Sequence, residues 1–422
     1  MEASPSEPAG PVSASPPVPL RRILFVDDDP SVLDGLRHRL RRQRHRWDMV
    51  FVGGGEAALE VLAREPIDVI VTDLRMPHMD GATLLQLVQQ QHPQVIRIVL
   101  SGHAERETAM MAAGVAHQFL SKPSEHGLLE NVIERSCNLH LLIQDARIKR
   151  LVGRVGHLPS MPQVYHQIRA AVEQQDGSAA QVAFILKQDI AICAKVLQLV
   201  NSAFFRLYRS IVDVEEAVAY LGFDTIQRIT LAVELFQQSR GVPGPRVHEV
   251  EALHKHGVLV GQIAAGLFAD KRMKEDAFVV GLLHDIGKLV LVVGMPEHMD
   301  RATLEAQRSG CSLYEAEATI SGVTHAEVGA YLLGLWGLQY SVVEAVAYHH
   351  TPWKVDTSEM ALLTGAYIAD GLARELLAAG SDQPQPVWLD QGYLDRIGVG
   401  ERMTDWREMA SREVAKFVAS TA

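Results

Sequence analysis

The sequence predicts an α/β domain followed by an all-α domain. In the first third of the 422-residue chain, short apolar runs alternate with helix-like sequence, which is typical of a parallel sheet covered by helices. From about residue 153 the strand pattern disappears, and segments with helical periodicity follow one another between Pro and Gly. A chain of this length exceeds one ordinary core, so two or three domains are expected.

The α/β part is predicted to contain five strands. The candidates are Ile23–Val26, Met49–Val52, Val69–Thr72, Ile96–Leu100 and Gln118–Leu120. We expect a disordered lead rich in Pro, Ser and Ala at 1–20, the α/β domain at 21–140 and a helical linker at 141–152. The all-α domain is expected at 153–375, and a helical extension at 376–422.

A long helical stretch is predicted from the Lys122-Pro123 pair to about Leu151. Apolar and small residues recur along it in steps of three and four, at Leu129, Val132, Ser136, Leu139, Ile143 and Ala146. This heptad seam is shorter than three full heptads, and it is compatible with a short coiled coil and a homodimer. It is equally compatible with a last helix that packs on its own sheet and continues as a linker.

Composition narrows the classes of protein. The net charge of −11 argues against nonspecific nucleic-acid binding. The arginine cluster Arg37–Arg46 is better interpreted as a solvated helix face than as a nucleic-acid patch, and without a helix-turn-helix reader we expect no direct DNA binding. Three widely spaced cysteines indicate structural thiols in a reducing compartment. Neither a membrane span nor a signal peptide is evident, which predicts a cytoplasmic protein without membrane contact.

Reactive side chains follow four of the predicted strands. They are Asp27, Asp28, Asp73, Ser101 and Lys122. A single Asp at a strand end is usually a helix cap or turn former, but parallel strands bring all five positions to one edge of the sheet. Carboxylates there can hold Mg²⁺, and one of them can accept a phosphoryl group. The hydroxyl and the lysine can contact the oxygens of that group.

These residues resemble the receiver domain of response regulators. The motifs are VDDDP, the D-x-x-M-P-x-M-D-G run from Asp73 to Gly81, LSG and KP. The resemblance implies a flavodoxin-like fold, Asp73 as the phosphoacceptor, and a cognate sensor histidine kinase as partner. It further implies Mg²⁺ bound by Asp27, Asp28, Asp73 and the backbone carbonyl of Arg75.

The same resemblance implies a switch pair formed by Ser101 and Phe119, which repositions when Asp73 is modified. Lys122 would contact the phosphoryl group. Ser stands where Thr is commoner and Phe where Tyr is common, so Phe119 cannot make a phenolic hydrogen bond.

Histidines and aspartates gather in the all-α part. The candidate metal ligands are His256, His284, Asp285, His325, His349, His350 and Asp370. Imidazole and carboxylate together suit a pair of transition-metal ions. A lone buried histidine usually makes an ordinary hydrogen bond, but the joint set favours a metal centre. His254 should point away from His256, because residues two apart do not share a helix face.

As a set, these residues resemble the HD metal-dependent phosphohydrolases. LPSMP, the NSAFF stretch and AVAYLGF resemble the HDOD domain, a relative of that superfamily. The HDOD resemblance implies a regulatory module that engages a protein partner or a second messenger. The sequence retains the metal-type residues but has TPWKVD after His350, where the cyclic di-GMP hydrolase branch has a Gly-Tyr-Pro loop.

The alternative is a phosphorylation-gated, metal-dependent phosphohydrolase that resembles cyclic dinucleotide phosphodiesterases. His284, Asp285 and Lys288 would then be catalytic. The missing Gly-Tyr-Pro loop favours the binding module over this enzyme.

Overall fold

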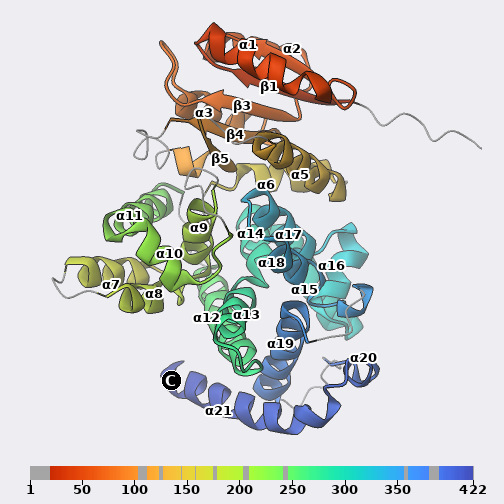
Figure 1. Ribbon diagram of the computed structural model, residues 1–422. Helices are drawn as coiled ribbons and strands as arrows, with labels where there is room; N and C mark the ends of the chain where they lie inside the picture. The colour runs from red at the N-terminus through yellow and green to blue at the C-terminus, as the bar shows by residue number, and fades with distance from the viewer. Residues whose placement is uncertain are drawn as a thin grey trace, which may run out of the picture.

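The computed structural model describes residues 20–102, 112–122, 127–143, 145–156, 158–173, 178–202, 209–240, 246–355, 360–379 and 389–421. The expected lead lies outside the described residues except for Leu20. Part of the NSAFF stretch and Pro123 lie outside them as well. The chain forms a sheet domain with a helical domain beneath it (Figure 1).

A parallel sheet of five strands forms the first domain, as predicted. The strands are β1 Arg21–Val26, β2 Trp47–Val52, β3 Val69–Asp73, β4 Ile96–Ser101 and β5 Gln118–Ser121. Their order is β2-β1-β3-β4-β5, which is the flavodoxin-like arrangement. The carboxyl ends of all five strands therefore lie along one edge, where the chain places its polar residues.

Helices cover the sheet. They are α1 Pro30–Arg39, η1 Leu40–Gln43, α2 Gly55–Arg64, α3 Gly81–Gln91, η2 Ala112–Gly114 and α5 Leu128–Leu142 (Figure 1). Aspartates cap two of the helices: Asp29 accepts a hydrogen bond from the backbone of Ser31, and Asp80 accepts one from that of Thr83.

The predicted continuous helix from 123 to 151 is wrong, because α5 ends at Leu142 and Ile143 is extended. A new helix, α6 (Ala146–Arg154), begins after Asp145, whose side chain accepts a hydrogen bond from the backbone of Arg147. An N-cap of this kind favours a helix start over continuation. Ile143 is buried within the chain, so the predicted heptad seam does not run through as one exposed stripe.

Every regular element among the described residues of the second domain is a helix, as predicted. Its first helices are α7 Pro162–Glu173, α8 Ala179–Leu186, α9 Ile190–Val200, α10 Val214–Leu221, α11 Phe223–Arg240, α12 Val247–Gly266, α13 Lys271–Leu283 and α14 Ile286–Gly294. The others are α15 Pro296–Ser309, α16 Leu313–Ser321, α17 His325–Leu335, α18 Tyr340–Tyr348, η4 Pro352–Lys354, α19 Leu362–Ala378, α20 Gln391–Arg396, η5 Gly400–Arg402 and α21 Met403–Thr421.

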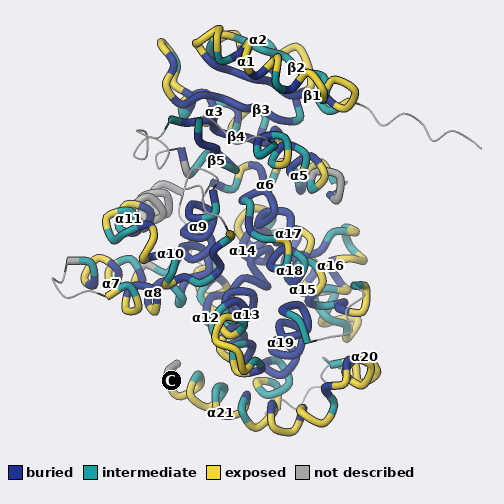
Figure 2. The backbone as a smooth tube through the Cα atoms, viewed as in Figure 1, coloured by how far each residue is buried: buried dark blue, intermediate teal, exposed yellow. Residues whose placement is uncertain are grey.

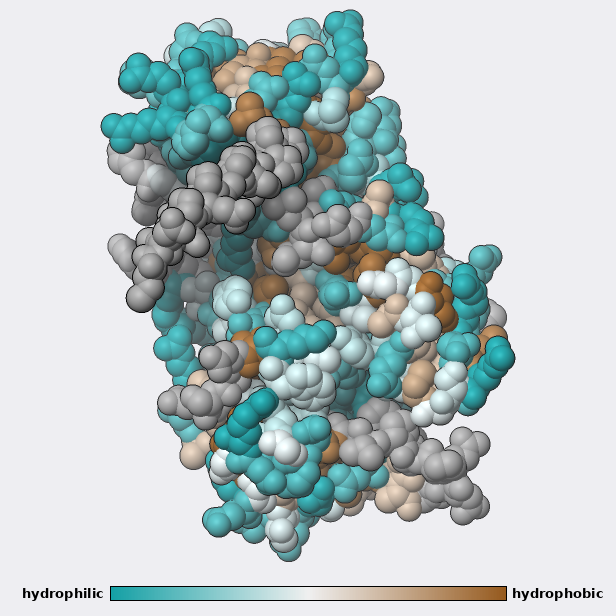
Figure 3. Space-filling view, turned by 90° about the vertical axis from the view of Figure 1, so that its right-hand side faces the viewer, coloured by the Kyte–Doolittle hydropathy of each residue, from teal (hydrophilic) through white to brown (hydrophobic). Residues whose placement is uncertain are grey.

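The core of this domain contains helices that are buried over most of their length. Figure 2 shows α9, α14 and α17 largely in dark blue, and their sequences are correspondingly apolar on every side. The segment Lys271–Gly294 is long and apolar enough to cross a membrane, but 83% of its most apolar window is buried inside the protein. The face seen in Figure 3 is mostly hydrophilic, with hydrophobic patches near the top and across the middle.

A buried arginine joins the two domains at the amino ends of β4 and β5. Arg97 is fully buried, and its guanidinium donates to the carbonyl of Val115 and, at 2.6 Å, to that of Gly153 at the end of α6. It also lies 3.0 Å from Nε2 of His117. The amide of Gln198 on α9 donates to the carbonyl of His117. The helical domain is thus attached at the amino ends of the strands, whereas Asp73 lies at the carboxyl end of β3.

Close backbone contacts reinforce this attachment. A side chain at Gly153 would place its Cβ 1.7 Å from the carbonyl oxygen of Pro93, so only glycine permits the contact. On the other flank, Leu139 of α5 packs against Gly334 of α17. The guanidinium of Arg135 donates to the carbonyl of Leu338. The helix expected to pack on its own sheet therefore also contacts the second domain.

Candidate functional site

The first site lies where β1, β3 and β5 end. Nζ of Lys122 lies 2.6 Å from Oδ2 of Asp27 and 2.6 Å from Oδ1 of Asp73. Both carboxylates are almost fully buried, and the exposed Asp28 joins them in a group whose oxygens lie within 4.8 Å of one another. Three converging carboxylates are a donor set that Mg²⁺ prefers. The residues present therefore fit that ion.

The charges of this site stabilise one another. Burial disfavours a charged Lys122, but its hydrogen bonds to Asp27 and Asp73 and their negative charges raise its pKa above the ordinary value. The backbone N–H of Arg75 donates to Oδ2 of Asp73 at 3.2 Å and helps to orient the carboxylate. Gly81 is required nearby, because a Cβ there would lie 2.0 Å from the carbonyl oxygen of Asp73.

The two remaining predicted residues lie on neighbouring strands. Ser101, the last residue of β4, is fully buried, and its hydroxyl lies 3.4 Å from the carbonyl of Gly102. Phe119 on β5 is also buried, with 1% of its surface exposed. Its ring fills the domain core, as a residue without a phenolic hydroxyl can do.

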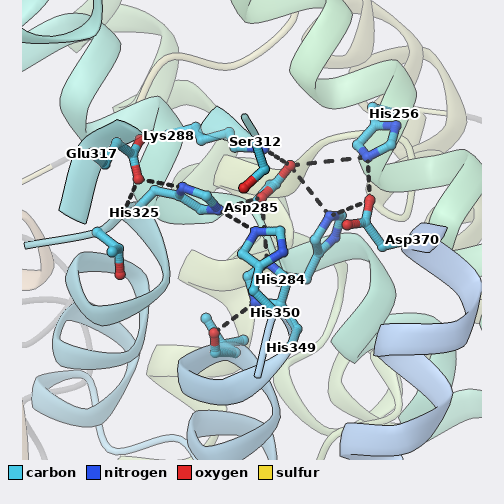
Figure 4. A network of polar contacts seen from close by, with 12 residues as sticks. His256, His284, Asp285, Lys288, Ser312, Glu317, His325, His349, His350 and Asp370 are labelled. Carbon is cyan, nitrogen blue, oxygen red and sulfur yellow. Dashed lines mark hydrogen bonds and ion pairs between the residues drawn. The ribbon is translucent and has the colours of Figure 1, made fainter. Parts of the chain in front are cut away.

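The second site lies between helices of the second domain that are far apart in the sequence (Figure 4). His284 and Asp285 form the turn between α13 and α14, and His325 is the first residue of α17. The other candidate ligands come from α12, from the turn after α18 and from α19: His256, His349, His350 and Asp370. All members of the predicted set are therefore brought together.

Asp285 is the centre of this cluster. Its Oδ1 lies 3.2 Å from Nε2 of His325 and 3.7 Å from Nε2 of His349. Its Oδ2 lies 3.3 Å from Nε2 of His284 and 3.9 Å from Nε2 of His256. Two groups with metal-ligand spacing share this carboxylate, one with His325, His349 and His350, the other with His256 and His284. A shared aspartate can bridge two metal ions.

The polar atoms of the cluster fit a metal centre. Nδ1 of His284 donates to the carbonyl of Gly281, and Nδ1 of His349 donates to that of Val346, so the Nε2 atom of each ring faces the carboxylate of Asp285. Both Nε2 atoms and Oδ1 of Asp285 are buried without a hydrogen-bond partner among the described residues. Buried polar atoms are normally paired, so an additional partner is expected here.

The charges around the cluster are strongly perturbed. Burial opposes a charge on His284, but Asp285 and Asp370 outweigh it and raise its pKa to about 9. Burial lowers the pKa of His349 to about 4, which keeps that ring neutral and able to bind metal.

Two site residues were missed by the sequence analysis. Oε2 of the buried Glu317 accepts a hydrogen bond from Nδ1 of His325 at 2.6 Å, which turns the Nε2 of that ring toward Asp285. The guanidinium of Arg374 makes hydrogen bonds of 2.8 and 2.9 Å to the carboxylate of Asp370. The spacing of Asp370 and Arg374, four apart on one helix, is a signal that could have revealed the second residue.

His254 points away from the cluster, as predicted. Its Nδ1 accepts from the backbone of Ile190, and its Nε2 donates to the carbonyl of Pro159 in the LPSMP motif. The buried Asp189 accepts from the backbone of Met161 in the same motif at 2.5 Å. These residues fasten the segment before α7 to α9 and α12, so their role is structural.

A cavity of about 1000 Å³ opens beside Asp285. Lys288, whose Nζ lies 2.6 Å from Oδ2 of Asp285, lines its wall together with His256 and Arg374. A cavity of this volume can hold a small-molecule ligand. The centre is therefore accessible from a pocket that carries two cationic side chains.

Comparisons with known proteins agree with the two-domain organisation. Residues 23–134 match the family model of the response regulator receiver domain, and residues 158–352 match that of the HDOD domain. An uncharacterized protein of Treponema pallidum is 27% identical over 218 residues, which are 50% of this chain and 42% of the relative.

A further relative and one solved structure match parts of the chain. The response regulator protein PilR of Pseudomonas aeruginosa is 35% identical over 121 residues, 28% of this chain and 26% of the relative. The chain thus spans less than half the length of these curated relatives. The response regulator MmoQ of Methylococcus capsulatus is 19% identical, with a TM-score of 0.46 over 60% of this chain and 98% of that one. From the two family matches, the chain contains a response regulator receiver domain followed by an HDOD domain.

Proposed function

We propose that the protein is a two-component response regulator that accepts a phosphoryl group on Asp73 and transmits the change to its HDOD domain. The observation that carries the proposal is the placement of Lys122, whose Nζ lies 2.6 Å from the carboxylates of both Asp27 and Asp73. The phosphoryl donor would be a cognate sensor histidine kinase, and the protein would then act in the cytoplasm without membrane or direct DNA contact.

The carboxylates of Asp27, Asp28 and Asp73 and the carbonyl of Arg75 would hold Mg²⁺, which offsets the repulsion between the acceptor and the incoming phosphoryl group. An oxygen of Asp73 forms the new bond to phosphorus as the bond to the donor breaks. Lys122 then balances the charge of a phosphoryl oxygen.

Ser101 and Phe119 would act as the switch pair. The Ser101 hydroxyl can donate to a further phosphoryl oxygen if it turns away from Gly102. Its movement would alter the packing beside Phe119 on β5, the strand whose amino end meets the helical domain. Modification adds roughly −1.5 to −2 charge units, which biases an equilibrium between two arrangements of this packing.

Labelling with acetyl phosphate and Mg²⁺ tests this proposal. The wild type should acquire an acid-stable, base-labile phosphoryl group, and Asp73→Ala should acquire none. Asp80→Ala is a matched control, because Asp80 lies on the same loop but caps α3 through Thr83. Equal labelling of Asp73→Ala would show that the acceptor is another residue.

For the output, we propose a regulatory module that engages a protein partner or a second messenger. The buried polar contacts of Arg97 and Gln198 support direct transmission, because a change in β4 or β5 must affect Gly153 and α9. A homodimer is compatible with this output. Comparing the partners captured by Asp73→Ala and by the phosphorylated wild type tests whether phosphorylation controls engagement.

A second candidate function is a phosphorylation-gated, metal-dependent phosphohydrolase with His284, Asp285 and Lys288 in catalytic roles. It is favoured by the unpartnered Nε2 atoms of His284 and His349 around the unpartnered Oδ1 of Asp285. A bound transition-metal pair would supply an activated water and polarise a phosphoryl oxygen. Lys288 would stabilise negative charge that develops on the phosphoryl group.

Metal quantification and hydrolysis assays separate the two outputs. The purified chain should be assayed with cyclic di-GMP and a generic phosphodiester, with His284→Ala as the paired variant. Metal-dependent turnover that disappears in His284→Ala supports the enzyme. An absence of both metal and turnover supports the regulatory module.

A further inference from the structure

We infer that the cavity beside Asp285 binds a phosphate monoester whose body is a single aliphatic chain. The phosphate would lie at Lys288 and Arg374, and the chain would lie between α12, α15 and α19. The place of the phosphate rests on the proposed metal centre. The place of the aliphatic chain follows from the cavity walls alone.

The inner end of the cavity is suited to a phosphate group. Lys288 pairs with Asp285, Arg374 pairs with Asp370, and both cationic side chains line the cavity. In this arrangement the two carboxylates balance the two cations. With a divalent cation on the carboxylates, Lys288 and Arg374 retain surplus positive charge toward the cavity. An arginine fork and a lysine amine are the usual partners of a phosphate dianion.

The remaining walls are suited to an aliphatic chain. Apolar side chains predominate there, among them Leu253, Met299, Leu304, Leu313 and Leu377, and Thr303 and Gln307 add uncharged polar groups. Among the described residues that line the cavity, none is Phe, Tyr or Trp. A nucleobase would therefore find no aromatic side chain on which to stack, whereas methylene groups gain from leaving water for this surface.

The outer part of the cavity presents apolar surface to solvent. Leu304 and Leu377 line the wall and are 65% and 44% exposed, so a bound chain would cover them. The acidic lining residues Glu249 and Asp300 both pair with Arg246, at 3.1 and 2.7 Å. Arg246 thus offsets one of these two negative charges, and both carboxylates are about half exposed, so solvent screens their remaining repulsion of an anionic ligand.

Calorimetric titration of the full chain with Mn²⁺ present tests the inference, with decyl phosphate, AMP and inorganic phosphate as probes. Decyl phosphate should bind more tightly than either of the others. The double variant Leu304→Gln/Leu377→Gln should weaken decyl phosphate roughly tenfold while leaving inorganic phosphate unchanged. Leu231→Gln is the matched control, because Leu231 is 42% exposed on α11, away from the cavity lining.

Arg374→Met separates the phosphate end from the chain end, because it should weaken decyl phosphate and inorganic phosphate alike. The inference is overturned if AMP binds as tightly as decyl phosphate, if decyl phosphate does not bind, or if the double leucine variant binds it unchanged. Binding without release of phosphate would retain this ligand class and reject the hydrolase. Hydrolysis of a generic phosphodiester without binding of decyl phosphate would retain the hydrolase and reject this ligand class.

Discussion

The buried amine of Lys195 links the stability of this protein to pH. It lies on α9, where its Nζ donates to the carbonyl of Gly156 at 3.2 Å and lies 5.1 Å from the ring centre of Trp336. Burial lowers its pKa from 10.5 to about 7. Below pH 7 the amine is charged in both the folded and the unfolded chain, so the full cost of burying the charge is present.

Between pH 7 and 10.5 only the unfolded chain keeps this proton, so the contribution of Lys195 to the free energy of unfolding rises by about 1.4 kcal/mol per pH unit. In Lys195→Met the side chain has no amine, so it binds no proton in either the folded or the unfolded chain. The difference in stability, wild type minus variant, should therefore grow by about 2 to 3 kcal/mol from pH 7 to pH 9.

Urea unfolding followed by tryptophan fluorescence at pH 7, 8 and 9 measures this difference. Lys195→Arg is the control, since it keeps a hydrogen-bond donor but does not titrate in this range. Its difference from the wild type should grow in the same way. A difference that stays constant across the series would refute the reasoning, because it would mean that Lys195 does not lose its proton in the folded chain.

Three further predictions concern the domain contact, the metal centre and the HDOD motif. Gly153→Ala forces a methyl group against the carbonyl of Pro93 and should destabilise the protein by about 1–3 kcal/mol in thermal unfolding. Gly35→Ala is the control, because a Cβ at Gly35 would meet nothing within 4 Å, and an equal loss of stability in both variants would contradict the contact. Glu317→Gln weakens the hydrogen bond that orients His325 and should lower Mn²⁺ affinity about 10–100-fold by calorimetry, whereas unchanged affinity would show that this hydrogen bond does not support metal binding. Asp189→Ala leaves buried backbone N–H groups unpaired and should cost about 2–4 kcal/mol in urea unfolding; wild-type stability would argue against the predicted loss.

The sheet could be predicted from sequence because its strands are short apolar runs buried on both faces. Val69–Asp73, for example, is buried at every position and ends in the acidic residue that belongs to the site. The order of the strands then places Asp27, Asp73 and Lys122 together without any long-range information beyond the parallel arrangement. The grouping of the histidine set was also predictable, because its His and Asp residues recur on successive predicted helices. Metal binding by this set stays a prediction.

The roles of Glu317 and Arg97 could not be predicted, because they depend on tertiary contacts that local sequence does not encode. Glu317 becomes a partner of His325 only because α16 packs against the start of α17. The sequence around Arg97 indicates only a strand residue, because the carbonyl groups that it contacts come from separate segments of the chain. The break after Leu142 was the exception, because Asp145 is a recognisable N-cap that the apolar periodicity concealed.

The buried guanidinium at the amino end of β4 limits how freely these domains could be exchanged between proteins. A chimera that joined a foreign receiver to residue 145 would present Gly153 and α9 to a surface without Arg97, and the carbonyl of Gly153 would lose its donor. A successful graft would have to transfer Arg97, Pro93 and His117 together with the helical domain. The junction between the two modules is therefore a property of the sheet as much as of the linker.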